Sequence, residues 1–180
     1  MKRRAVLQKF SDVEPESLKW LWAGRIPSGM LTVVSGNPGE GKSLALTDMV
    51  ARVTNGSDWP DGSRASEPGD VILINVEDAV AAVQRPRLDA AGADVERVRR
   101  IEAVELTHDE GVVESKSFSI MDAADVLRSA LEQLDNPRLI VLDPLAAFLA
   151  GVRSNDQGDI RAALAPLVQL SEEFDVAIAP

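Results

Sequence analysis

The sequence predicts an α/β fold in which a mainly parallel central sheet is flanked by helices. Three observations support this fold class. Short apolar runs rich in β-branched residues alternate with longer stretches whose apolar residues recur at helical spacing. A glycine-rich loop directly follows the first apolar run, and strands that alternate with helices pair in parallel. The chain has 180 residues and is 45% hydrophobic, which is enough for one domain with a sizeable core.

The first half of the chain is divided by apolar periodicity and by turn residues. Residues 1–28 are an irregular lead-in expected to pack on the core domain, which spans residues 29–180. The elements expected next are a buried strand at Met30–Ser35, a helix at Lys42–Asn55, a loop at 56–69, a buried strand at Val71–Val76 and a helix from about Ala79 to Ala91. Pro86 is expected to break the last helix and to open a second turn, because proline lacks an N–H group.

The second half continues the alternation. The elements expected there are a weaker strand at Val98–Val104, a polar loop at 105–117, a helix at Asp122–Asp135, a strand at Leu139–Leu142, a loop at Gly151–Gly158, a helix from about Asp159 to Glu173 kinked at Pro166, and a buried strand at Val176–Ala179. A buried strand needs backbone partners on both sides. We therefore interpret the sequence as the N-terminal part of a longer protein, with C-terminal strands of the core missing.

Charge and composition exclude several classes of function. The 29 acidic residues exceed the 19 basic ones and give a net charge of −10, so a broad basic face for duplex DNA is not expected. Binding of a single strand through a few local loops stays open. Cysteine is absent, which excludes disulfides and thiolate chemistry, and the one histidine, His108, is expected in an exposed loop. No signal peptide or membrane span is recognisable, so we expect a soluble, cytoplasmic protein.

A P-loop is the strongest motif in the sequence. Its eight residues fit the pattern G-x4-G-K-S, and we expect them to bind nucleotide together with the next residue, Leu44: they are Gly36, Asn37, Pro38, Gly39, Glu40, Gly41, Lys42 and Ser43. Glycines allow successive N–H groups to point at phosphate oxygens, and the helix that follows adds its positive N-terminal end. Lys42 is expected to reach the β- and γ-phosphates of ATP, and the Ser43 hydroxyl is expected to bind Mg²⁺.

A second candidate for the magnesium site is Asp143, which ends the strand-like run that begins at Leu139. A carboxylate at the C-terminal end of a buried parallel strand lies at the edge of the sheet where ligands bind. This position is typical of a Walker B aspartate that holds Mg²⁺ through water. The competing interpretation is an ordinary aspartate that ends a strand before the turn at Pro144.

Glu77 is the candidate for the carboxylate that orients or deprotonates the attacking water. Many AAA+ proteins place a glutamate directly after the Walker B aspartate, but here that position is Pro144. Glu77 and Asp78 end the second predicted strand, on the same edge of the sheet as the P-loop. A glutamate at this position resembles the arrangement in RecA-like ATPases, and this resemblance implies that Glu77 is catalytic, with Asp78 as the cap of the next helix. The alternative is that both residues only cap that helix.

Over most of its length the chain resembles the RepA-like branch of RecA-type ATPases. The resemblance begins near Leu18 and rests on the string from Trp20 to Ser43 together with four shorter matches, which are Val76–Asp78, Arg87–Leu88, Leu142–Leu145 with Phe148, and Asn155–Asp156 before Ile160–Arg161. Proteins of this branch are hexameric helicases of plasmids and their relatives in phages and integrated elements. The resemblance implies a RecA-like P-loop NTPase fold and an ATP-hydrolysing domain with Glu77 as its catalytic carboxylate.

The resemblance also implies partners. Such proteins form rings, commonly hexamers, with ATP between subunits, and act on single-stranded DNA with other replication proteins. Their polar sensor segment and arginine finger follow the last strand seen here and would lie beyond Pro180. Two alternatives stay open: a RecA-like regulatory or recombination-mediator ATPase without unwinding, and a P-loop kinase. A kinase would normally show an arginine-rich lid, and the sequence contains none.

Three further side chains have two interpretations each. In the family an arginine follows the glutamate at about the spacing of Arg87, so this residue is either close to the nucleotide or a structural support paired with a nearby acid such as Asp89 or Asp78. Trp20 and Trp22 could stack on bases. Their position just before a core strand instead favours packing of the lead-in onto the domain.

Overall fold

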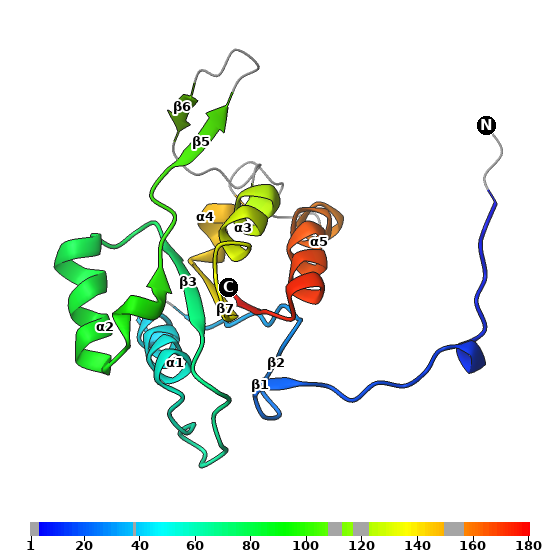
Figure 1. Cartoon of the computed structure of the whole chain (residues 1–180), viewed down its shortest axis with the longest axis horizontal. Helices are drawn as coiled ribbons and strands as arrows, with labels where there is room; N and C mark the ends of the chain where they lie inside the picture. Colours follow the sequence, from blue (N-terminus) through cyan, green and yellow to red (C-terminus); the bar gives the residue numbers. More distant parts are fainter. Residues whose placement is uncertain (1–3, 38, 108–112, 117–122, 150–156) are drawn as a thin grey trace.

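The fold is α/β, as predicted. The computed structural model describes residues 4–37, 39–107, 113–116, 123–149 and 157–180. Its central sheet has four strands in the order β4-β3-β7-β8, and every neighbouring pair is parallel. The strands are β3 (Asp70–Asn75), β4 (Val98–Arg99), β7 (Pro137–Asp143) and β8 (Ala177–Ala179). Helices cover both faces of this sheet, α1 and α2 on one side and α3 and α5 on the other (Figure 1).

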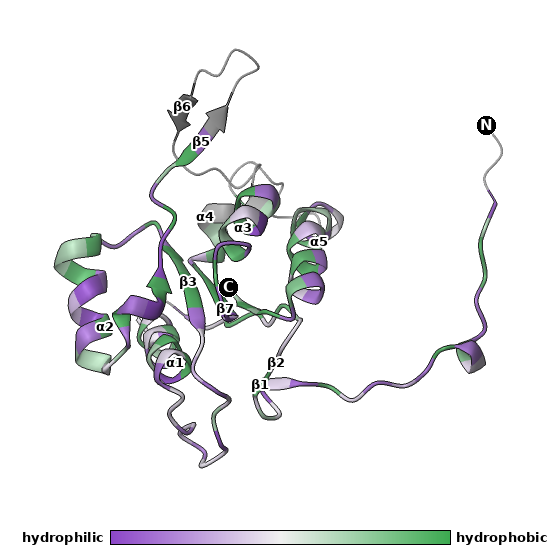
Figure 2. Ribbon diagram, in the orientation of Figure 1, coloured by the Kyte–Doolittle hydropathy of each residue, from purple (hydrophilic) through white to green (hydrophobic). Residues whose placement is uncertain are grey.

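Alternate residues of each strand enter two separate cores. The core under α1 and α2 takes Val71, Leu139, Val141, Ala177 and Ala179 from the sheet. The core under α3 and α5 takes their neighbours, which are Ile72, Ile74, Ile140, Leu142 and Ile178. Because strand side chains alternate between faces and both faces are covered, these strands are apolar at nearly every position. Figure 2 shows the corresponding hydrophobic colour along the central strands.

The predicted strand at Met30–Ser35 is an extended segment that lies beside β8. The Thr32 N–H donates to the Ile178 carbonyl at 2.8 Å, and the Ile178 N–H donates to the Met30 carbonyl at 3.0 Å. Only Leu31 forms a regular bridge, which is parallel to Ile178. The segment therefore continues the parallel sheet beyond β8 and delivers the chain into the glycine-rich loop.

The helices follow the predictions closely. α1 spans Lys42–Asn55, as predicted, and ends at Gly56, whose φ of 65° a residue with a Cβ rarely adopts. The helix expected from about Ala79 to Ala91 is not broken near Pro86 but changes type there: a π-helical turn, η2 (Val80–Gln84), runs directly into α2 (Arg85–Ala91), and Pro86 lies in the first turn of α2. α3 (Ala123–Leu131) is shorter than predicted because the following residues form tighter turns. α5 spans Gln157–Phe174 with Pro166 inside it.

The prediction for residues 98–117 is wrong in part. The expected strand at Val98–Val104 is divided into β4 and β5 (Val104–Thr107), because β4 pairs with β3 over only two residues. The expected polar loop contains β6 (Val113–Lys116), which pairs antiparallel with β5. The alternating pattern of these short runs was too weak to separate from a loop. His108 lies outside the described residues.

Two boundaries at the carboxyl edge of the sheet also differ from the predictions. β3 ends at Asn75, and Val76, predicted as the last residue of a buried strand, is 57% exposed. The chain turns there because the Asn75 side chain accepts the N–H groups of Glu77 and Asp78. β7 is longer than predicted, and the short helix α4 (Leu145–Phe148), which periodicity did not indicate, follows it.

The lead-in is less irregular than predicted, because it contains the short 3-10 helix η1 (Phe10–Asp12) and an antiparallel pair, β1 (Trp20–Trp22) and β2 (Ile26–Pro27). Trp22 stacks on Trp59 with ring centroids 4.6 Å apart, and Leu21 and Ile26 enter the core. Residues 4–20 are exposed, and the part of the chain before Lys19 extends away from the domain (Figure 1). Trp20 itself is 39% exposed.

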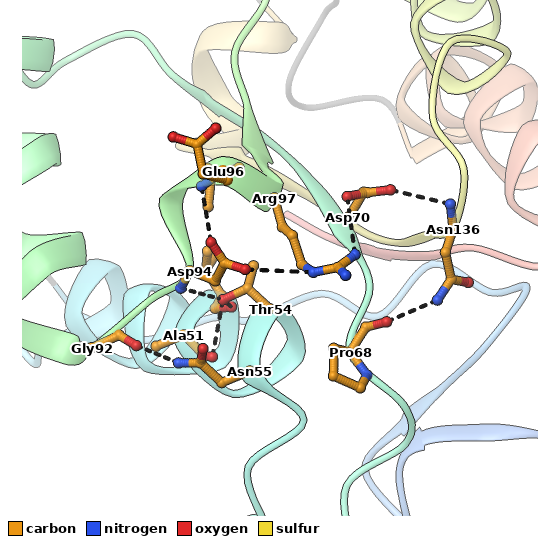
Figure 3. A network of polar contacts seen from close by, with 12 residues as sticks. Ala51, Thr54, Asn55, Pro68, Asp70, Gly92, Asp94, Glu96, Arg97 and Asn136 are labelled. Carbon is orange, nitrogen blue, oxygen red and sulfur yellow. Dashed lines mark hydrogen bonds and ion pairs between the residues drawn. The ribbon is translucent and has the colours of Figure 1, made fainter.

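A polar network fastens the opposite edge of the sheet, where β3 and β7 begin (Figure 3). The Asp70 carboxylate accepts the Asn136 N–H at 3.1 Å and lies 3.6 Å from the Arg97 guanidinium, which also faces Asp94 at 3.5 Å. Thr54 at the end of α1 accepts the Asp94 N–H at 3.1 Å. These contacts connect the end of α1 with the beginnings of β3 and β7. In the parts of the chain that are described, no helix has the length and apolarity required to cross a membrane.

Candidate nucleotide site

Three segments deliver polar residues to the same edge of the sheet. β3 ends at Asn75 and β7 ends at Asp143, and these two residues are register partners on neighbouring strands. The extended segment beside β8 runs in the same direction and leads into the P-loop. Since all these segments are parallel, their carboxyl ends meet at one edge, where ligands of open α/β sheets bind.

The backbone of the P-loop depends on its glycines. Gly39 and Gly41 have φ values of 83° and 88°, a region that residues with a Cβ rarely adopt. Gly41 is also the N-cap residue of α1, so the left-handed turn leads directly into the helix. The first N–H groups of α1 have no intrahelical acceptor and lie at the positive end of the helix dipole. Pro38, also predicted to contact nucleotide, lies outside the described residues.

Lys42 folds back over the loop. Its ammonium group donates to the Gly36 carbonyl at 2.7 Å and to the Asn37 carbonyl at 2.8 Å. Two neutral acceptors of the loop therefore hold the cation. Phosphate oxygens would offer it charged acceptors, which form stronger hydrogen bonds than carbonyl groups.

Glu40 stabilises the same turn. Its carboxylate accepts the Asn37 N–H at 2.7 Å and the Asn37 side-chain N–H at 2.8 Å. These hydrogen bonds, with a smaller contribution from the nearby Lys42 charge, lower the pKa of Glu40. A Cβ added at Gly36 would lie 2.8 Å from the Glu40 carboxylate, so glycine gives this carboxylate room.

A pocket lies beside the first turn of α1. Its polar lining comes from α1, from the ends of β3 and β7, and from the turn and helix after β3, and consists of Ser43, Thr47, Asn75, Asp78, Gln84, Arg87 and Asp143. The pocket thus brings together the two residues predicted to hold Mg²⁺, Ser43 and Asp143. Glu77 is exposed and is not among the lining residues, whereas Asp78 is.

The prediction that Asp78 caps the next helix is wrong. Ala79 is the N-cap residue of η2, and no side chain forms a capping hydrogen bond there. The Asp78 carboxylate instead accepts from the Arg87 guanidinium at 2.7 Å. Of the two acids proposed as partners of Arg87, Asp78 is therefore the one used, and Asp89 pairs with Arg85 at 2.9 Å. Arg87 both supports this turn and lines the pocket.

The comparison with protein families identifies the class of this site. A family model described as an AAA domain matches residues 1–179, which is nearly the whole chain. The chain belongs to the AAA domain family. It is a P-loop ATPase domain, and the P-loop and parallel sheet predicted from the sequence agree with that membership. No curated protein matches the chain. The more specific resemblance to the RepA-like branch stays a prediction.

The polar groups of this AAA domain suit Mg²⁺ held partly by phosphate. Within the described parts of the chain, no group of three or more histidine, cysteine or acidic residues could enclose a metal ion. Mg²⁺ is commonly bound by one or two protein oxygens together with substrate phosphates and water. Ser43 and Asp143, which both line this pocket, match that pattern.

Two residues of the AAA domain site were missed in the sequence. Asn75 contacts Asp143 and the turn after β3, and Gln84 donates to the Asn75 carbonyl at 3.2 Å and to the Asp78 carbonyl at 2.7 Å. Asn75 carried one usable signal, since an asparagine at the end of an apolar run commonly accepts N–H groups two residues on. Gln84 carried none, because it lies in a helical stretch and its contacts depend on the fold.

Proposed function

We propose that this AAA domain binds ATP with Mg²⁺ and hydrolyses it. The P-loop backbone, from Gly36 to Leu44, would hold the phosphates, with Lys42 facing the β- and γ-phosphates. Ser43 and Asp143 would hold the metal, the serine directly and the aspartate through water. The bound Mg²⁺ would neutralise charge that develops on the transferred phosphoryl group. The observation that carries this proposal is the pocket that Ser43 and Asp143 line together beside the glycine-rich loop.

Glu77 is proposed as the carboxylate that orients the attacking water. Its N–H donates to the Asn75 side chain at 3.1 Å, so its backbone is fixed at the carboxyl edge of the sheet. Its side chain is exposed and free to face a phosphate bound in the P-loop. Pro144 occupies the position after Asp143 and cannot supply an acid, and Glu40 of the P-loop is held by Asn37. The acid is therefore expected from the turn after β3, which carries Glu77 and Asp78. Asp78 is already engaged by Arg87.

We further propose that the domain works as a ring-forming motor of the RepA-like branch, most often a hexamer, acting on single-stranded DNA with other replication proteins. Support comes from the long string around the P-loop and from the shorter matches, two of which contain Asp78 and Arg87. These two residues form an ion pair, so a single contact in the structure accounts for a residue in each of the two matches. ATP would then lie between subunits, and a neighbouring subunit would supply the arginine finger.

One experiment tests the function and separates its alternatives. ATP hydrolysis is measured with Mg²⁺ alone, with added single-stranded DNA, and with small phosphoryl acceptors, while light scattering follows assembly. The proposal predicts Mg²⁺-dependent hydrolysis, stimulation by single-stranded DNA and formation of a ring in ATP. Hydrolysis without any response to DNA favours a regulatory ATPase. Transfer of phosphate to a small acceptor favours a P-loop kinase and contradicts the proposal.

A further inference from the structure

Asn75 uses every hydrogen-bonding position of its side chain at the candidate site. Its side-chain nitrogen donates to the Asp143 carboxylate at 3.2 Å and to the Asp78 carboxylate at 3.4 Å. Its side-chain oxygen accepts the Glu77 N–H at 3.1 Å and the Asp78 N–H at 2.8 Å. A carboxamide has two donor hydrogens and two acceptor lone pairs, so these contacts exhaust its capacity.

The donor side of Asn75 separates two acids. The Asp143 and Asp78 carboxylates both approach the same side-chain nitrogen, and like charges at this range destabilise each other. The two hydrogens of the amide point between them and give each carboxylate a donor. Arg87 lies 2.7 Å from the same Asp78 oxygen and neutralises that carboxylate, whereas Asp143 forms no ion pair with any residue that the structure describes.

The acceptor side of Asn75 fixes the backbone that carries Glu77. Both N–H groups of the turn are held by one oxygen, and Gln84, which is only 8% exposed, donates to carbonyl groups on either side of that turn. Polar groups held in this way keep a single conformation, because any other conformation would leave one of them without a hydrogen bond and would cost free energy. One amide therefore links the end of β7 to the turn after β3.

We propose that Asn75 is a positioning residue that holds the Asp143 carboxylate in the orientation required to bind Mg²⁺ with ATP. The inference rests on the proposed function, because it requires Asp143 to hold the metal. One Asp143 oxygen accepts from Asn75, and the other would be the one to accept from water bound to the metal. Groups that orient a metal-holding side chain commonly change metal affinity by about 10- to 100-fold when they are removed.

The alternative is that Asn75 only forms the turn after β3. Asn75→Ser separates the two roles, because a serine hydroxyl can still accept turn N–H groups but is too short to reach Asp143. The matched control is Asn136→Ser, the same chemical change at the other end of β7, where the side chain donates to the Pro68 carbonyl at 2.9 Å (Figure 3). Asn75→Thr serves as a second variant, since β-branched residues suit strand ends.

The experiment measures the affinity of a fluorescent ATP analogue as a function of Mg²⁺ concentration, with thermal melting as the check on folding. Asn75→Ser should raise, by about tenfold or more, the Mg²⁺ concentration that gives half of the increase in affinity for the ATP analogue. The affinity for the analogue without Mg²⁺ should stay near that of the wild type. Asn136→Ser should leave the Mg²⁺ dependence unchanged. A folded Asn75→Ser or Asn75→Thr protein with wild-type Mg²⁺ dependence would overturn the inference.

A double variant tests whether Asn75 acts through Asp143. In an Asp143→Asn background the effect of Asn75→Ser on Mg²⁺ dependence should disappear, because the carboxylate it orients is gone. An equal effect in both backgrounds would overturn the inference while leaving the magnesium site intact. If Asp143→Asn alone leaves the Mg²⁺ dependence unaltered, the proposed role of Asp143 fails instead, and the two failures are distinguishable.

Discussion

The Asp78 carboxylate accepts a hydrogen bond from the Arg87 guanidinium at 2.7 Å, and this ion pair joins the end of β3 to α2. The two residues are nine positions apart, and the π-helical turn η2 lies between them. Both line the pocket that also contains Ser43 and Asp143. The pair therefore gives the turn after β3 a fixed position beside the candidate nucleotide site.

The ion pair is expected to contribute measurably to stability. Its side chains are 39% and 27% exposed, so the coupling should be near the upper end of the range for surface pairs, about 1 kcal/mol. A double-mutant cycle with Arg87→Met and Asp78→Asn, read by urea denaturation, measures it. The matched control is Arg85→Met with Asp89→Asn, an exposed pair on the same helix that should couple by about 0.5 kcal/mol or less. Equal coupling energies in both cycles would contradict the claim that the Asp78–Arg87 pair stabilises the protein more than the exposed Arg85–Asp89 pair.

Glu77→Gln should leave ATP binding intact and reduce hydrolysis by about a hundredfold, the effect of losing a general base. Asp78→Asn should weaken the contact with Arg87 and change turnover far less. Successive side chains at a strand end point in different directions, so at most one of the two acids should face the γ-phosphate. Binding and turnover are measured on each variant. Normal hydrolysis by Glu77→Gln together with loss in Asp78→Asn would assign the role to Asp78 instead.

Asp70→Ala should destabilise the protein by about 2 kcal/mol, because it removes the acceptor of a partly buried backbone N–H and the partner of a cation. The Asp70 side chain is 10% exposed, accepts the Asn136 N–H at 3.1 Å and faces Arg97. Urea denaturation measures the change. Glu102→Ala, which removes an acid that is 81% exposed, is the control and should change stability by less than about 0.5 kcal/mol. A similar loss of stability in both variants would mean that the polar network in Figure 3 contributes little to the free energy of unfolding.

The contact between β1 and the loop before β3 should be lost only in strong acid. Hydrogen bonds from Ser63, and further ones from Trp22 and Arg25, lower the pKa of Asp61 well below its ordinary value of 3.8. Because the pKa of Asp61 is lower in the folded state, the charged carboxylate stabilises the folded contact above pH 3.8. This stabilisation is lost progressively as the pH falls below 3.8 and Asp61 is protonated.

Tryptophan fluorescence follows this contact, since Trp22 stacks on Trp59. The wild-type signal should stay constant from neutral pH to about pH 4 and change below it. Asp61→Asn should have an altered signal already at neutral pH and should lack the acid step. A wild-type transition above pH 3.8 that persists in Asp61→Asn would contradict this assignment.

Much of the fold followed from local patterns in the sequence. α1 was predicted at its observed bounds, because three local signals indicate the same helix. They are the glycine-rich loop before it, its periodic apolar face, and Asn55-Gly56 at its end. The buried strands were recognisable because both of their faces are covered, which makes them continuously apolar. The place of Pro86 in the first turn of α2 followed from covalent chemistry alone, because proline lacks an N–H group.

The parts that sequence reasoning missed depend on contacts between distant residues. β5 and β6 are stabilised by pairing with each other, which a short alternating run does not reveal. β3 ends one residue early because the Asn75 side chain holds the turn. Asp78 was assigned to a cap, although it was also one of the two acids considered as partners of Arg87. The choice between Asp78 and Asp89 depends on the turn η2, which brings Arg87 to Asp78.

The central claim is that the glycine-rich loop binds the phosphates of ATP with Lys42 facing them. Equilibrium binding of a fluorescent ATP analogue with Mg²⁺ to the wild type and to Lys42→Ala tests this most directly. The loss of a charged hydrogen-bond donor should weaken binding by about tenfold or more. Lys19→Ala, which removes an exposed lysine paired with Asp175, should bind like the wild type. Unchanged affinity in a folded Lys42→Ala protein would contradict the account.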